Sequence, residues 1–143
     1  MADELKPEEF SFSQTQEFNK TDGANTAISE LSKKGYQYLK DNSTKEAIEA
    51  FNQILNIEEN NNYALVGLGD SERKQCHFKE AIEYYSKCLS CHPGNNYALF
   101  GLADCYKAIN QYKKAIEIWE QYLVHDDRNI TVLTSGSFPG SSL

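Results

Sequence analysis

The residues most capable of chemistry in this sequence are a pair of cysteines followed by a histidine. Cys88, Cys91 and His92 follow the spacing Cys-x-x-Cys-His, through which c-type haem is attached to proteins. The same thiols and imidazole could instead coordinate zinc with Cys76 or His77, although a single Cys-x-x-Cys pair is a weak zinc motif. A metal- or haem-binding protein is therefore one hypothesis.

Other kinds of chemistry have little support in the sequence. The histidines at 77, 92 and 125 each lie near an expected turn rather than in a shared pocket, and no Gly-rich phosphate loop is present. The net charge of −7 disfavours a nucleic-acid partner, because phosphate contacts need clustered lysine and arginine. We therefore expect neither enzymatic activity nor a cofactor.

The expected location is the cytoplasm. The N-terminus lacks the basic start and apolar run of a secretory signal. No stretch approaches the ~20 apolar residues of a membrane span, so no membrane partner is expected. In the cytoplasm the four cysteines would be thiols rather than disulfides.

Two short sequence words recur at the same interval. The word Asn-Asn-Tyr-Ala-Leu-x-Gly-Leu begins at Asn61 and again 34 residues later at Asn95. A second word, Lys-x-Ala-Ile-Glu, begins at Lys45, Lys79 and Lys113, again with a spacing of 34. A shared period of this length indicates a protein built from stacked repeat units.

Each unit is expected to form two helices, because its apolar and small residues are spaced three and four apart. Ser43 begins a capping-box sequence for the second helix of the first unit, and the Asn runs at 60–62 and 95–96 supply turns between units. The register aligns Cys88 with Ile54 in the apolar stripe, which makes Cys88 a core residue rather than a haem ligand. Small residues would let the paired helices approach closely, and large rings would fill the space between units: Gly35, Gly69, Ala103, Ala47, Ala81 and Ala115, then Phe51, Tyr85 and Trp119.

This pattern resembles the tetratricopeptide repeat family. The resemblance implies an all-α fold, a right-handed solenoid of antiparallel helix pairs, over residues 25–134. The units are residues 28–61, 62–95 and 96–129, with the start of a fourth at 130–134. Residues 1–24 are acidic and are expected to be disordered, and residues 135–143 form a Gly/Ser/Pro tail.

The resemblance also implies a function. In this family the first helices line a concave groove that commonly binds a peptide or a partner's helix, which implies a protein-binding scaffold or adaptor. Helical phase assigns these residues to the groove: Lys33, Tyr36, Tyr63, Val66, Asp70, Arg73, Lys74, Tyr97, Phe100, Asp104 and Lys107. The chaperone-tail subtype is not indicated, because no cluster of cationic and amide donors occupies its clamp positions, which hold Ser32, Tyr36, Gly67, Tyr97 and Gly101.

The aspartates of this groove suggest the chemistry of the ligand. If Asp70 and Asp104 accept hydrogen bonds from it, the ligand should be neutral or basic, with apolar side chains. Alternatively, these carboxylates pair with Arg73 and Lys107, each three residues further along its helix.

Two further alternatives concern the ends of the chain. No polar capping helix is evident after the third unit, so its apolar end could stack on another copy of the chain. The residues of this end are Ile116, Trp119, Tyr122, Val132 and Leu133. At the other end, the phenylalanines at 10, 12 and 18 could fold back into the groove.

Overall fold

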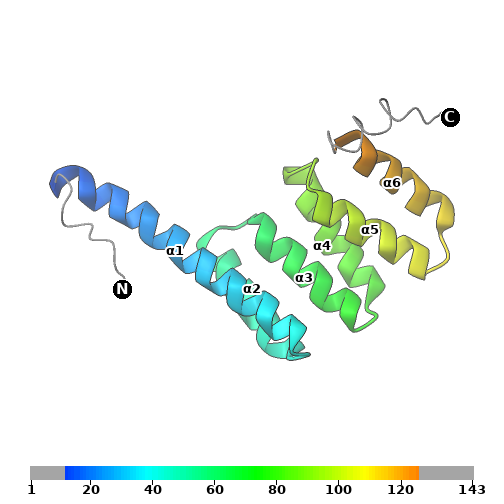
Figure 1. The fold of residues 1–143 in the computed structure, drawn as a ribbon, viewed down its shortest axis with the longest axis horizontal. Coiled ribbons are helices and arrows are strands. Elements are labelled where there is room, and N and C mark those ends of the chain that lie inside the picture. The colour runs from blue at the N-terminus through cyan, green and yellow to red at the C-terminus, as the bar shows by residue number, and fades with distance from the viewer. Residues whose placement is uncertain (1–11, 126–143) are drawn as a thin grey trace, which may run out of the picture.

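The computed structural model describes the backbone of residues 12–125 and the side chains of residues 23–124. Six α-helices and no strands occur in this part of the chain (Figure 1). The helices are α1 (Phe12–Lys40), α2 (Thr44–Ile57), α3 (Asn62–Lys74), α4 (Phe78–Cys91), α5 (Asn96–Ala108) and α6 (Tyr112–His125). None of them combines the length and apolar character that crossing a bilayer would require.

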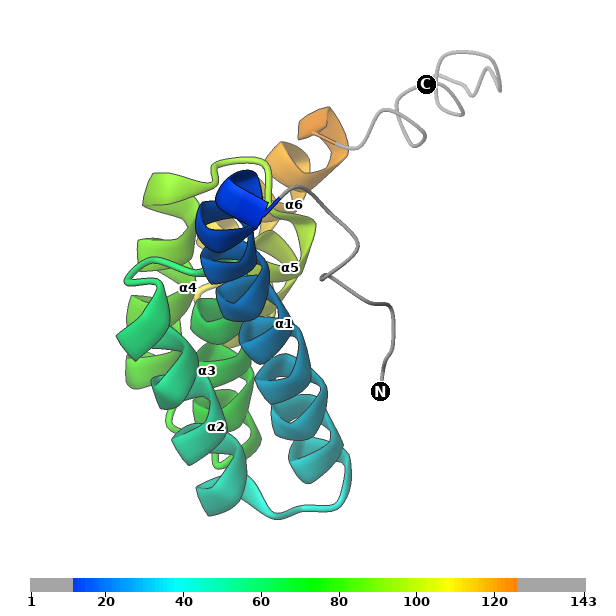
Figure 2. The same ribbon diagram turned by 90° about the vertical axis from the view of Figure 1, so that its left-hand side faces the viewer.

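The helices pack as three pairs, α1 with α2, α3 with α4 and α5 with α6, and each pair contacts the next. The first helices of successive pairs also touch, α1 with α3 and α3 with α5, whereas within residues 12–125 the second helices do not touch one another. The stack therefore curves with the first helices on its inner side. Figure 2 looks along this stack from the α1 end. The predicted all-α solenoid is confirmed.

A buried aromatic ring fills the space between successive pairs. Phe51 of α2 and Tyr85 of α4 are fully buried, and each ring lies against glycines of two first helices. A Cβ atom added at Gly67 would lie 2.4 Å from the Phe51 ring, and one at Gly101 would lie 2.3 Å from the Tyr85 ring. These glycines are needed for space. The sequence analysis predicted that rings fill the space between units, but it paired the small residues with one another rather than with the rings.

The helices α3 and α5 begin at asparagine N-caps. The Oδ1 atom of Asn61 accepts the N–H of Ala64 at 2.9 Å, and that of Asn95 accepts the N–H of Ala98 at the same distance. These asparagines were expected only to form turns, and they also satisfy the free amides of a helix start. The capping-box prediction was wrong in its contact, because Ser43 precedes α2 but its side chain makes no capping hydrogen bond. Its backbone, with ψ of 65°, is not in the β region that an N-cap residue typically adopts.

The turn inside each pair repeats the same backbone conformation. The second of its three residues has a positive φ in every unit, 64° at Asn42, 64° at Cys76 and 67° at Asn110. Asparagine adopts this left-handed region with little penalty, whereas other side chains seldom do. Cys76 is therefore the strained member of the set.

The helix α1 starts earlier than the sequence predicted. Disorder was expected over residues 1–24, but the backbone is helical from Phe12 onward, and in Figure 1 this part of α1 projects past α2. No proline lies between Phe12 and Lys40, so nothing stops the helix from continuing toward the N-terminus. Residues 1–11, the start of the fourth unit and the tail at 135–143 lie outside the described residues.

Candidate functional site

A hollow of about 470 Å³ opens on the inner side of the stack, between α1, α3 and α5. We call it the tyrosine hollow. It is lined by Ser32, Tyr36, Asn62, Tyr63, Val66, Asp70, Asn95 and Tyr97. The structure thus brings together predicted groove residues from all three units.

The tyrosines of this hollow differ in how firmly they are held. The side chains of Tyr63 and Tyr97 are 55% and 77% exposed. Tyr36 is half-buried, with its ring edge-on to Phe51 at a centroid distance of 5.0 Å, and its hydroxyl donates to the Tyr63 carbonyl oxygen at 2.9 Å. Burial, together with the nearby charge of Asp70, raises the pKa of Tyr36. Tyr36 is therefore a fixed wall of the hollow, and the other two rings are free to contact a ligand.

A second hollow of about 530 Å³ adjoins the first, further along the same helices. We call it the charged hollow. Its lining residues are Leu39, Lys40, Asp70, Arg73, Lys74, Phe78, Asp104 and Ala108. Asp70 lines both hollows, so the two form neighbouring parts of one surface.

Three of the predicted groove residues lie apart from these two hollows. Lys33 lines a third hollow near the start of α3, which shares Ser32, Asn62 and Tyr63 with the tyrosine hollow. Phe100 is exposed on α5, and neither it nor Lys107 lines any of the three hollows. The predicted groove is therefore three adjoining hollows, with Phe100 and Lys107 outside them, rather than one continuous trough.

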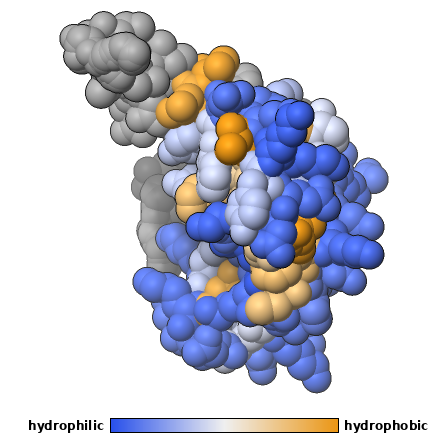
Figure 3. Space-filling view, turned by 90° about the vertical axis from the view of Figure 1, so that its right-hand side faces the viewer, coloured by the Kyte–Doolittle hydropathy of each residue, from blue (hydrophilic) through white to orange (hydrophobic). Residues whose placement is uncertain are grey.

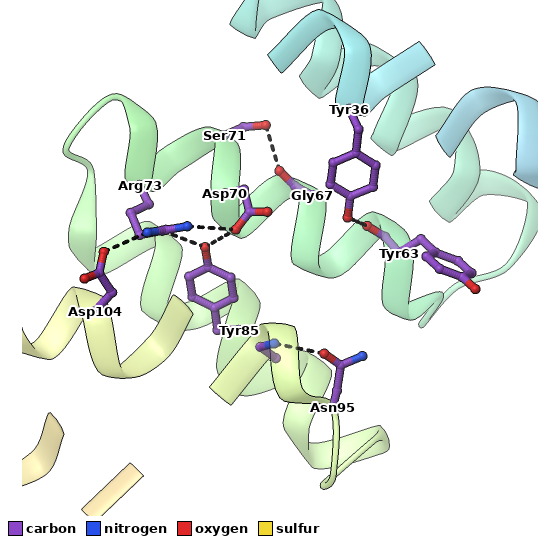
Figure 4. A network of polar contacts seen from close by, with 10 residues as sticks. Tyr36, Tyr63, Gly67, Asp70, Ser71, Arg73, Tyr85, Asn95 and Asp104 are labelled. Carbon is purple, nitrogen blue, oxygen red and sulfur yellow. Dashed lines mark hydrogen bonds and ion pairs between the residues drawn. The ribbon is translucent and has the colours of Figure 1, made fainter. Parts of the chain in front are cut away.

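A polar network lies where the two hollows meet (Figure 4). Arg73 bridges two first helices, with Nη1 2.7 Å from Asp104 Oδ2 and Nη2 3.4 Å from Asp70 Oδ1. Tyr85 reaches the network from α4, where its hydroxyl donates to Asp70 Oδ1 and accepts the Nε–H of Arg73 at 3.0 Å. The expected pairing of Asp70 with Arg73 is confirmed, but Asp104 pairs with Arg73 rather than with Lys107.

The two oxygens of Asp70 have different surroundings. Both contacts from the network go to Oδ1, and no hydrogen bond reaches Oδ2 from the residues that the structure describes. Figure 4 shows this second oxygen on the side that faces Tyr36. Burial raises the pKa of Asp70, and the Tyr85 hydroxyl and the Arg73 guanidinium offset part of that rise.

The Cys-x-x-Cys-His motif is divided between core and surface. Cys88 is buried, as predicted, whereas Cys91 at the end of α4 is exposed. Burial also raises the pKa of Cys88 to about 11. His92 follows the helix, and its Nε2 lies 3.1 Å from the carbonyl oxygen of Asn60. Across the described part of the chain, no three His, Cys, Asp or Glu side chains lie close enough to hold a metal ion.

The sequence analysis missed the part that Tyr85 plays at the site. It was assigned to the core by its register with Phe51, and its ring is indeed buried. The signal that could have revealed more is the hydroxyl itself, because a buried Tyr O–H usually needs a polar partner. Asn62 and Asn95 were missed as lining residues because they were interpreted only as turn formers.

The fold and the inner hollows define a class of protein, a solenoid of helical hairpins with a concave, aromatic-lined face. A sequence profile of the tetratricopeptide repeat matches residues 72–132. Together with the fold, this match supports a protein of the tetratricopeptide repeat family, as the resemblance in its sequence indicated. Among curated protein sequences, none matches the chain.

Solved structures with the same fold include the TPR domain of Arabidopsis OM64, which has a TM-score of 0.68 and 17% identity and covers 74% of this chain and 88% of its own. The TPR2B domain of yeast Sti1, in its complex with pHsp70, has a TM-score of 0.68 and 17% identity, with 78% and 89% covered. A tetratricopeptide repeat protein from Parabacteroides merdae has a TM-score of 0.61 and 25% identity, and here 71% of this chain spans 41% of the other. The first two similarities show the fold alone.

Proposed function

We propose that this protein is a scaffold that binds an extended segment of another protein along the inner side of its solenoid. The observation that carries the proposal is the pair of exposed tyrosines, Tyr63 and Tyr97, at the edge of a concave hollow. Tyrosine is enriched at protein interfaces because its ring offers a large contact area with little loss of side-chain entropy. The binding role is proposed in place of an enzymatic one.

The hollow is largely preformed, which favours binding. The hydrogen bond from Tyr36 to the Tyr63 carbonyl oxygen links α1 to α3, and Arg73 links α3 to α5. A surface whose walls are already fixed loses less conformational entropy when a ligand binds. An extended segment lying across these helices would meet the tyrosine hollow and then the charged hollow.

The proposed ligand is a neutral or basic segment with apolar side chains. Apolar side chains fit the rings and Val66 of the tyrosine hollow. The structure of the yeast Sti1 domain is that of a complex with pHsp70, which supports partner binding as a use of this fold. An adaptor role in the cytoplasm stays a prediction from the sequence.

The test is a double substitution, Tyr63→Ala with Tyr97→Ala, assayed by capture of peptides from a displayed random library. Both side chains are largely exposed, so circular dichroism should show unchanged helicity while capture falls at least about tenfold. Tyr112→Ala is the matched control, because Tyr112 is also exposed but lies on α6, outside both hollows. Equal capture by the wild-type protein, the double variant and Tyr112→Ala would place the binding site elsewhere.

A second candidate function is self-association through α6. Tyr112, Ile116 and Val124 of this helix are exposed, whereas Ile82, the counterpart of Ile116 in α4, packs against the core. Figure 3 views this end of the stack and shows the apolar side chains as separate patches among hydrophilic ones, which makes this candidate the weaker one. Light scattering over a concentration series would support self-association if the mass rises with concentration in the wild-type protein but not in Ile116→Lys. A constant monomeric mass in the wild-type protein would refute it.

A further inference from the structure

The tyrosine hollow combines aromatic rings with a single charge. Three of its lining residues are tyrosines, and Asp70 is the only charged residue among them. Aromatic faces attract cations through their electron density, and a carboxylate oxygen beside them adds an ion pair. We propose that this hollow binds the cationic side chain of a lysine or arginine in the partner segment, an inference that rests on the proposed binding function.

The negative charge of Asp70 is only partly neutralised within the protein. One guanidinium, that of Arg73, serves two carboxylates, so the cluster of Arg73, Asp70 and Asp104 keeps a net charge of −1. The contact of Arg73 with Asp104 is the shorter, 2.7 Å against 3.4 Å, so the remaining negative charge is concentrated on Asp70. Its Oδ2 has no hydrogen-bond partner within the described residues and lies on the side of Tyr36. This oxygen is available to a cation in the hollow.

The neighbouring lysines do not occupy this position. Lys40 and Lys74 line the charged hollow, on the other side of Asp70, and neither lines the tyrosine hollow. Their charges make the charged hollow unfavourable for a second cation. The ligand's lysine or arginine is thereby directed to the tyrosine side of Asp70.

The helix dipoles set where in the hollow the cation lies. The N-termini of α3 and α5 carry partial positive charge, which repels a cation within about the first turn. Asp70 lies eight residues beyond Asn62, the first residue of α3, or about 12 Å along the helix at ~1.5 Å per residue. The charged group therefore belongs at the Asp70 end, between this carboxylate and the tyrosine rings, with the aliphatic stem along Val66.

The experiment uses the full chain and a displayed library of random peptides, followed by affinity measurements on a selected peptide. Lysine or arginine should be enriched at one position of the bound peptides. Replacing that residue by norleucine, which keeps the apolar stem and removes the charge, should weaken binding by about tenfold. Asp70→Asn should reduce the preference for the charged peptide over the norleucine peptide.

Because Asp70→Asn also changes the contacts of Tyr85 and Arg73, an exposed ring supplies a second pair of variants. Tyr97→Phe keeps the aromatic face and should keep the preference for the charged peptide. Tyr97→Leu keeps an apolar side chain and should reduce that preference by several fold, while the control Tyr112→Leu leaves it unchanged.

The outcomes separate this inference from the proposed function. Peptides that bind equally well with lysine or norleucine, or an equal preference in Tyr97→Phe and Tyr97→Leu, would refute the cation site while leaving the binding scaffold intact. Enrichment of no peptide at all by the wild-type chain would refute both.

Discussion

Replacing Tyr85 by phenylalanine would remove one oxygen atom from the centre of the molecule. The ring would remain, and the first unit already carries a phenylalanine, Phe51, at the equivalent position. The substitution therefore leaves the packing against Gly69 and Gly101 intact. What it removes is the hydroxyl that donates to Asp70 and accepts from Arg73.

The expected loss of stability follows from these two contacts. A hydrogen bond to a charged group contributes about 1.5–3 kcal/mol when it is shielded from water. The side chains of Asp70 and Arg73 are 27% and 28% exposed, so water replaces part of what is lost. We expect the free energy of unfolding to fall by about 1–2 kcal/mol, with each kcal/mol lowering the Tm of a domain of this size by about 4 °C.

The loss should also depend on pH. Burial raises the folded-state pKa of Asp70 above its ordinary value of 3.8, so the folded chain binds this proton at a higher pH than the unfolded chain does. Protonation of Asp70 therefore stabilises the fold, and that stabilisation is lost as pH rises through the folded pKa. Without the Tyr85 hydroxyl this pKa rises further. The loss in free energy of unfolding caused by Tyr85→Phe should thus be largest at neutral pH and should shrink as pH falls toward 3.8.

The assay is urea unfolding followed by circular dichroism at several pH values. Tyr84→Phe is the matched control, because the Tyr84 hydroxyl makes no hydrogen bond with the described residues and should be lost with little effect. A deficit below about 0.5 kcal/mol at neutral pH, or one that grows as the solution is acidified, would show that the hydroxyl does not stabilise the Asp70 carboxylate.

Three further predictions concern single positions. Gly67→Ala places a Cβ 2.4 Å from the buried Phe51 ring and should lower thermal stability by about 1–3 kcal/mol, whereas Gly23→Ala, in open space on α1, should raise it by about 0.5–1 kcal/mol. Equal shifts of Tm in Gly67→Ala and Gly23→Ala would argue against the close approach of Gly67 to the Phe51 ring. Cys76→Asn matches the asparagines at the equivalent turns and should stabilise the fold by about 0.5–1 kcal/mol, which chemical denaturation would contradict if the midpoint fell. A disulfide reagent should react quickly with the exposed thiols of Cys76 and Cys91 and slowly with the buried thiols of Cys88 and Cys105. Burial withholds the buried thiols from the reagent and raises the pKa of each to about 11. Four equal reaction rates would be incompatible with this fold.

The repeat period predicted the fold well because a register assigns burial directly. Once two words share a period of 34, each residue inherits the position of its counterpart, so Cys88 belongs with Ile54 in the core and Tyr85 belongs with Phe51 between the units. Helix boundaries were less certain. A helix ends only where a residue stops it, and nothing in the sequence between Phe12 and residue 24 does so.

The site was predicted only in part, for a different physical reason. Helical phase identifies which side chains face inward, and so found Tyr36, Tyr63 and Tyr97. It does not give the rotation between units, on which the contact of Arg73 with Asp104 depends. For the same reason it could not divide the groove into adjoining hollows or place Phe100 outside them.

The junction between the first and second units differs from the junction between the second and third, and this difference affects which helices unfold first. In a linear array, cooperativity depends on the energy of each nearest-neighbour junction. The second and third units are fastened by Arg73 through a charged network, whereas the first and second share the neutral bond from Tyr36. Partial unfolding should therefore start by releasing α1 and α2, and the remaining four helices should protect their amide protons as one block.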